Sequence, residues 1–189
     1  MSDLIDNTII GSLDSFSDPF NNFAIAKMYE NEKQYAPALS YYLRAAEYSD
    51  DSSIEIAYIS ILKIGSILAE TKTRNHNAIN SILQAISLMP GRKEGYFLLS
   101  KLYREMESWQ ESYTFCSIGL ALQSHSLSPL SGDVGYYGEQ CLLYEKYITA
   151  WYIGRKDESL QTLYNLASNY PIDEERAAQV MADLEKFNK

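Results

Sequence analysis

The chain has 189 residues, of which 46% are hydrophobic and 22% charged, with only 9 Gly and 5 Pro. This composition excludes a disordered or low-complexity chain and is sufficient for one domain with a real hydrophobic core. The formal net charge of -9 argues against nucleic acid as a ligand, because phosphate binding needs a dense basic face. Cys116 and Cys141 are too few for a disulfide framework, which suits a reducing compartment.

Residues 1–17 are polar with scattered apolar positions and a break at Gly11, so we expect an N-terminal arm here. This stretch has no basic region of the kind that begins a signal peptide. The longest apolar run, 54–68, contains Glu55 and Lys63 and is a poor bilayer span. We therefore expect no membrane span and a cytoplasmic location.

Beyond the arm, apolar residues recur at helical spacing, and polar turns separate the runs. Ser17-Asp18-Pro19 predicts the first helix start, because a capping side chain precedes proline in the first turn. The pattern predicts helices over 19–30, 35–48, 54–70, 78–89, 94–106, 109–122, 139–152, 157–168 and 173–187. Residues 50–53 offer a further helix cap. Residues 123–138, with Pro129 and three glycines, are expected to form one long flexible or turning loop.

The second helices of the predicted pairs share a spacing of small and large residues. The pattern is Ala38-x-x-x-Tyr42-x-x-Ala45 in the first pair and Ala78-x-x-x-Ile82-x-x-Ala85 in the second. Degenerate copies follow at Ser112, Cys116 and Gly119, and at Ser159, Leu163 and Leu166. Small side chains let two helices cross closely while large ones fill the holes beside them. The spacing predicts an all-α chain of antiparallel helix pairs that stack and present a groove.

With this spacing, residues 18–189 resemble the tetratricopeptide repeat family, whose pattern spans 34 residues. The resemblance implies a single domain, a right-handed α-solenoid of antiparallel helix pairs with a C-terminal capping helix. Its repeats are expected at about 19–52, 53–91, 92–124 and 139–171, and its cap at 173–187. The predicted cap has one apolar and one charged face, as the end of such a stack requires.

Residues 92–187 also resemble a helical region that accompanies inverting glycosyltransferases of the GT-A nucleotide-sugar type in certain bacterial proteins. The resemblance is carried by Arg92, Glu94, Tyr96, Leu99, Tyr103, Arg104, Trp109, Tyr113, Gly119, Tyr137, Gly138, Glu139, Ala150, Trp151, Tyr152, Gly154, Glu158, Ser159, Glu175 and Arg176. The chain has no Asp-x-Asp metal motif and no room for a nucleotide-sugar domain. The resemblance therefore implies an accessory role in glycan assembly rather than transferase activity.

We expect no catalytic residue, no cofactor and no metal site. His76 and His125 lack partners at ligand spacing, and the chain has no Gly-x-Ser-x-Gly elbow and no Cys/His constellation. In tetratricopeptide-like solenoids the concave side is lined by first-helix residues. The resemblance thus implies a partner-binding set of Phe23, Lys27, Leu62, Phe97, Lys101, Arg104, Tyr144 and Trp151. The alternative is that Phe97, Tyr144 and Trp151 simply pack on the next helix pair.

The leading hypothesis is a non-catalytic scaffold or adaptor that binds a protein segment with an acidic group in its groove. Two other hypotheses stay open. In an accessory component of a glycan-assembly system, Tyr136, Tyr137 and Trp151 would stack on sugar rings. In a structural subunit of a larger assembly, residues 1–17 would thread into a neighbour, which includes a homo-oligomer formed through the arm.

Overall fold

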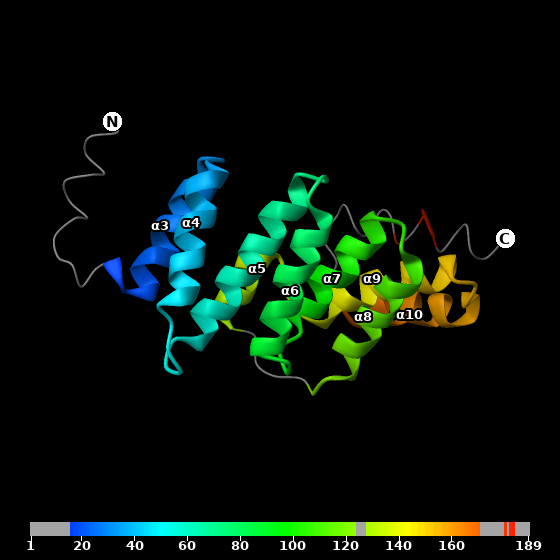
Figure 1. The fold of residues 1–189 in the computed structure, drawn as a ribbon. Coiled ribbons are helices and arrows are strands. Elements are labelled where there is room, and N and C mark those ends of the chain that lie inside the picture. Colours follow the sequence, from blue (N-terminus) through cyan, green and yellow to red (C-terminus); the bar gives the residue numbers. More distant parts are fainter. Residues whose placement is uncertain (1–15, 124–127, 171–179, 181, 184–189) are drawn as a thin grey trace. The chain divides into compact units, whose positions relative to one another are not determined.

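The computed structural model describes residues 16–123, 128–170, 180, 182 and 183. Eight α-helices (α3 to α10) and one 3-10 helix (η1) lie in this part of the chain, and it contains no β-strand (Figure 1). The predicted all-α class is therefore confirmed. The chain divides into two compact units, Met1–Pro90 (unit 1) and Gly91–Lys189 (unit 2). Among the described helices, none has the length and apolar character that crossing a membrane requires.

Unit 1 consists of two helix hairpins, α3 (Pro19–Asn31) with α4 (Tyr35–Glu47) and α5 (Ile54–Glu70) with α6 (Asn75–Leu88). The hairpins pack through α4 on α5, and α3 also contacts α5. The predicted start of α3 is confirmed, because the Asp18 carboxylate accepts a hydrogen bond from the Phe20 amide at 2.9 Å. Before α5, the Asp50 carboxylate instead accepts bonds from Ser52 and Ser53 and closes a turn. These bonds lower the pKa of Asp50.

Unit 2 repeats this plan with α7 (Glu94–Glu105), α8 (Trp109–Ala121), α9 (Glu139–Tyr152) and α10 (Lys156–Asn169). Here α8 packs on α9, and α7 also contacts α9. The described part of the predicted cap contacts α9: Val180 joins the core around Tyr147, whose hydroxyl lies 3.2 Å from the Asp183 carboxylate. The rest of the predicted cap and residues 1–15 of the predicted arm lie outside the described residues.

The long loop before α9 is packed against α7. It contains η1 (Pro129–Val134), and the Ser131 hydroxyl donates to the Glu94 carboxylate at 2.5 Å. The Tyr136 ring is 3% exposed and lies on Phe97, with 5.7 Å between ring centroids. Lys93 and Glu139 form an ion pair at the end of the loop. Several core contacts therefore hold this segment in place, although its glycine content predicts a flexible loop.

The small and large residues of the predicted crossing pattern are all buried, from Ala38 in α4 to Leu166 in α10. Two glycines show how close the helices approach. A Cβ atom on Gly65 would lie 2.6 Å from the Ile82 side chain, and one on Gly119 would lie 3.0 Å from Tyr96. Larger side chains at these sites would force the helices apart. The crossings therefore depend on small residues, as the spacing indicates.

The turn inside each hairpin contains one residue with a left-handed backbone: Lys33 (φ 58°), Lys72 (φ 54°), Glu107 (φ 59°) and Gly154 (φ 84°). In the first, third and fourth turns, this residue donates its amide to the carbonyl three residues earlier. The next amide reaches the carbonyl five residues earlier. This pair of bonds is the Schellman ending of a helix. We call the left-handed residue the turn residue and count positions on the preceding helix back from it.

Candidate functional site

The predicted partner-binding residues fall at three positions on the first helix of the hairpins. Position −10 holds Phe23, Leu62, Phe97 and Tyr144; position −6 holds Lys27 and Lys101; position −3 holds Arg104 and Trp151. Positions separated by three or four residues share one face of a helix. The structure thus places the set on one equivalent face of α3, α5, α7 and α9, which we call the first-helix face.

Position −10 contributes mainly to the core of each unit. Phe23, Leu62 and Phe97 are at most 6% exposed, while Tyr144 is half-buried. Phe23 packs edge-on against Tyr42 at 5.6 Å, and Tyr144 packs edge-on against Tyr147 at 5.3 Å. Phe23, Leu62 and Phe97 therefore support the face from the core and offer little surface of their own, whereas Tyr144 is partly accessible.

Position −6 places a lysine on the first-helix face of each unit. Lys27 is half-buried, and its Nζ lies 5.8 Å from the centre of the Phe23 ring. Lys101 is exposed, and its charge is close enough to lower the pKa of Glu145 against the larger effect of burial, which raises it. Of the two lysines, Lys101 is the more open to a partner.

Position −3 joins helices through charge. Arg104 donates to both carboxylate oxygens of Glu145, at 2.5 Å and 3.2 Å, and the Glu145 side chain is 3% exposed. Burial raises the pKa of Glu145, and the bonds from Arg104 offset only part of that rise. In unit 1 the same position is Glu30, which pairs with Lys63 at 2.5 Å and accepts a bond from the Tyr42 hydroxyl. Trp151 is at this position in α9, and the centre of its ring lies 4.9 Å from Nζ of Lys156.

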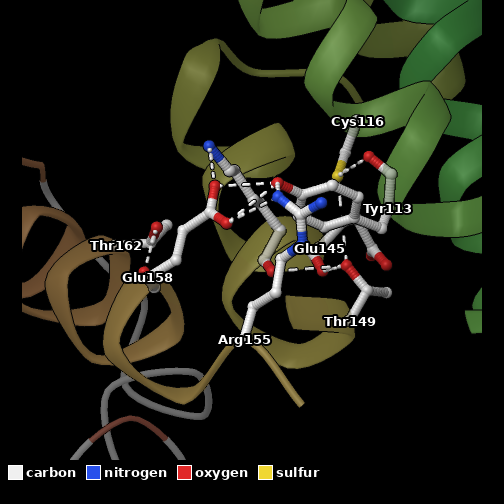
Figure 2. Close-up of polar contacts among 8 residues, drawn as sticks. Tyr113, Cys116, Glu145, Thr149, Arg155, Glu158 and Thr162 are labelled. Atoms are coloured by element: carbon white, nitrogen blue, oxygen red, sulfur yellow. Dashed lines mark hydrogen bonds and ion pairs between the residues drawn. The ribbon is translucent and has the colours of Figure 1, made fainter. Parts of the chain in front are cut away.

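A second polar cluster links α8, α9 and α10, and Figure 2 shows its contacts. The Tyr113 hydroxyl donates to the Glu158 carboxylate at 2.9 Å and accepts a bond from Arg155 at 2.9 Å. Lys146 also pairs with Glu158 at 2.9 Å. Burial would raise the pKa of Glu158, but the bonds from Lys146 and Tyr113 outweigh it and lower the pKa. The cluster is therefore a set of satisfied ionic contacts between three helices.

The thiol of Cys116 lies beside this cluster and is fully buried (Figure 2). It donates to the Tyr113 carbonyl at 3.1 Å. Burial raises the pKa of Cys116 to about 11, so at neutral pH the thiol is protonated and is a poor nucleophile. Among the described residues, no group of three or more His, Cys, Asp and Glu is placed to hold a metal ion.

Several residues of the second resemblance contact one another inside unit 2. Arg92 pairs with Glu94 at 2.5 Å, and the rings of Trp109 and Tyr152 stack at 4.0 Å. The two neighbouring tyrosines expected to stack on sugar rings differ in accessibility: Tyr136 is 3% exposed and Tyr137 is 60% exposed. These contacts give the motif a role in holding the helices of unit 2 together.

Sequence reasoning missed the buried partners Glu145, Lys93 and Ser131. The signal for Glu145 is present but faint: a carboxylate stands on α9 among Leu142, Leu143 and Tyr147, where helical spacing predicts an apolar side chain. A buried carboxylate needs a cation or hydrogen-bond donors, so this position already implies a partner on another helix. Neither a protein-family model nor a curated protein matches the sequence.

Proposed function

We propose that the chain is a non-catalytic, tetratricopeptide-like binding protein that holds a protein segment on the first-helix faces of its hairpins. In this proposal the hairpins belong to a right-handed α-solenoid that ends in a capping helix. One observation carries the proposal: the predicted partner-binding residues occupy equivalent positions in successive hairpins whose crossing residues are all buried. A recurring face of this kind is what repeat proteins use to hold extended partners.

Within the first-helix face, the accessible residues decide what can bind. Lys101 is exposed, and the half-buried rings of Tyr144 and Trp151 lie at positions −10 and −3 of α9. Half-buried aromatic rings provide apolar contact area, and an ammonium group attracts a carboxylate. The face of unit 2 therefore suits a protein segment that combines apolar and acidic side chains.

The test compares two charge reversals in the full-length protein, Lys101→Glu on the face and Lys33→Glu in a turn. Both lysines are exposed, and both changes alter the net charge equally. The control is well matched because Glu107 already occupies the same turn position in the third hairpin. Arg104→Glu is unsuitable, since it would place a second carboxylate against buried Glu145.

Immobilised protein is used to capture partners from its native source, and the bound proteins are compared by mass spectrometry. We expect Lys101→Glu to weaken capture of specific partners about tenfold, which corresponds to roughly 1.4 kcal/mol. Lys33→Glu should retain the same partners, and both variants should keep the helicity of the parent. If Lys101→Glu captures the same proteins as the parent, the first-helix face of unit 2 is not the binding surface.

A further inference from the structure

In each unit an ion pair at the same place of the repeat joins the two first helices, and these two pairs have opposite polarity. In unit 1 the acid is on the earlier helix: Glu30 of α3 contacts Lys63 of α5 at 2.5 Å. In unit 2 the base is on the earlier helix: Arg104 of α7 contacts Glu145 of α9 at 2.5 Å. The two units thus use the same kind of link with the charges exchanged.

The two pairs occupy the same places in the repeat. Glu30 and Arg104 are both at position −3, three residues before the turn residues Lys33 and Glu107. Their partners are both at position −9, since Lys63 precedes the turn residue Lys72 by nine residues, as Glu145 precedes Gly154. Equivalent positions in equivalent hairpins meet equivalent neighbours. The exchange of charge is therefore a true reversal at one site of the repeat.

Both pairs are shielded from water, so their charges matter energetically. The side chains of Lys63 and Glu30 are 12% and 20% exposed, and those of Arg104 and Glu145 are 25% and 3% exposed. Each acid has a further fixed contact: Glu30 accepts the Tyr42 hydroxyl, and Glu145 receives a second bond from Arg104. A like charge placed against Glu145 would be costly, because little solvent is present to screen it. Against Glu30, which keeps some access to water, the cost would be smaller.

The apolar crossings share one layout in all four hairpins, although the side chains at them differ. All four hairpins pack with the same spacing of small and large buried residues, for example Ala38 and Tyr42 or Ser159 and Leu163. Chains built from similar modules tend to assemble in the wrong order, within one molecule or between two. A feature that penalises the wrong neighbour adds to the discrimination that the crossings themselves provide.

We propose that the reversed ion pairs are a pairing code that directs each first helix to its own kind of neighbour. The code rejects α9 in the place of α5, and α5 in the place of α9, whether the wrong helix comes from the same chain or from a second copy. If α3 stacked on α9, Glu30 would meet Glu145. If α7 stacked on α5, Arg104 would meet Lys63. Both wrong neighbours bring like charges together at a shielded site, while both correct neighbours bring opposite charges together.

The experiment exchanges the charges within a unit. One double variant is Arg104→Glu with Glu145→Lys, and the other is Glu30→Lys with Lys63→Glu. Each restores an ion pair, leaves the net charge of the chain unchanged, and gives both units the same polarity. Full-length protein is refolded from denaturant over a range of concentrations, and the dimer fraction is measured by size-exclusion chromatography.

We expect each double variant to form about fivefold more dimer than the parent on refolding, the ratio that roughly 1 kcal/mol of lost discrimination produces. The quadruple variant, which exchanges both pairs, restores opposite polarity and should return to the dimer fraction of the parent. Double variants that refold to the parental dimer fraction would overturn the proposal. So would a quadruple variant that dimerises as much as the doubles, because disruption of the site would then explain the dimer.

A third variant, without charges at the ion pair of unit 1, keeps the test valid even where the charge exchange at the buried pair of unit 2 does not fold. Glu30→Gln with Lys63→Gln removes both charges at the more exposed pair of unit 1, and glutamine can still bond to Tyr42. It should also dimerise more than the parent, by less than the charge exchange does, since both repulsions are lost but no attraction is added. An unchanged dimer fraction in this variant would argue against the code.

Discussion

Unit 1 and unit 2 each stack two hairpins on small residues, but they differ in the charge that they bury. The buried polar side chains of unit 1 are Asn22, Ser53 and Ser60 among its described residues. The described part of unit 2 buries Lys93, Glu94 and Glu145 and six hydroxyl side chains. Each of these three buried charges has an ionic partner on another residue of the unit: Glu139, Arg92 and Arg104.

The difference teaches what the buried charges contribute. In the described part of unit 1 the hairpins pack without a buried charged side chain, and Glu30, the acid of the ion pair between its first helices, is more exposed than Glu145. The additional charges of unit 2 are therefore not required for the hairpins to stack. Buried ion pairs are weak evidence for stability, because desolvation offsets much of the attraction. Their value here lies in fixing which elements meet, including the loop that carries Ser131.

The largest expected effect tests the burial of the two ion pairs. Arg104→Met leaves Glu145 buried beside an apolar side chain, so we expect the free energy of unfolding to fall by about 3 kcal/mol. Lys63→Met leaves Glu30 with the Tyr42 hydroxyl and with access to water, so we expect a fall of about 1 kcal/mol or less. Urea denaturation of both variants measures the two losses. Equal losses would show that the two pairs are equally shielded.

An effect of intermediate size is the pH dependence of stability, to which the two buried carboxylates of unit 2, Glu94 and Glu145, contribute with opposite sign. Hydrogen bonds from Arg92 and Ser131 outweigh burial and lower the pKa of Glu94, so its contribution to stability is lost as pH falls below the ordinary value of 4.5. Burial raises the pKa of Glu145 despite Arg104, so its contribution is lost as pH rises above 4.5.

Glutamine variants check these opposite signs. Glu94→Gln should reduce the decrease in unfolding free energy that accompanies acidification. Glu145→Gln should reduce the decrease that accompanies a rise from acid to neutral pH. Denaturant midpoints measured between about pH 3 and about pH 7 would show both changes. A parallel shift of the whole curve in both variants would contradict the assigned directions.

The smallest effect tests whether the turns of the two units are equivalent. Gly154→Ala places a Cβ in a left-handed conformation and should cost about 1 kcal/mol of unfolding free energy. Lys33→Gly in unit 1 and Glu107→Gly in unit 2 relieve the same strain and should each gain roughly 0.5 kcal/mol. Thermal melting of the three variants measures this. Opposite signs for the two glycine variants would mean that their turns differ.

The sequence predicts the helices well where local signals are strong. The bounds of α9, Glu139–Tyr152, were predicted as the structure has them, because Gly138 and a polar turn enclose an apolar-periodic run. The start of α6 was predicted three residues late, at Ala78 instead of Asn75. The first residues of that helix are polar and exposed or half-buried, so they add nothing to the apolar period.

The site was less predictable, because its main features depend on contacts between distant residues. The spacing of the repeat was enough to place Lys101 and Arg104 on one face, but nothing local indicates that Arg104 pairs with Glu145, 41 positions away. Three of the four turn residues are lysine or glutamate rather than glycine. Because these residue types do not indicate a left-handed backbone, the sequence does not reveal that the four turns are equivalent. The structure does.

The docked loop of unit 2 has a consequence for any partner. Its backbone bends back on itself, with the Tyr136 amide bonded to the Ser131 carbonyl at 3.2 Å. Lifting the segment would take Tyr136 out of an apolar site and remove the Ser131 hydroxyl from a buried carboxylate. Loops that act as lids are drawn from the least stable parts of a protein, whereas the described part of this loop, 128–138, is held by contacts to the core. Under the proposed function, a ligand of unit 2 would therefore meet this segment already in place, and discrimination between ligands would rest on complementarity to a preformed surface.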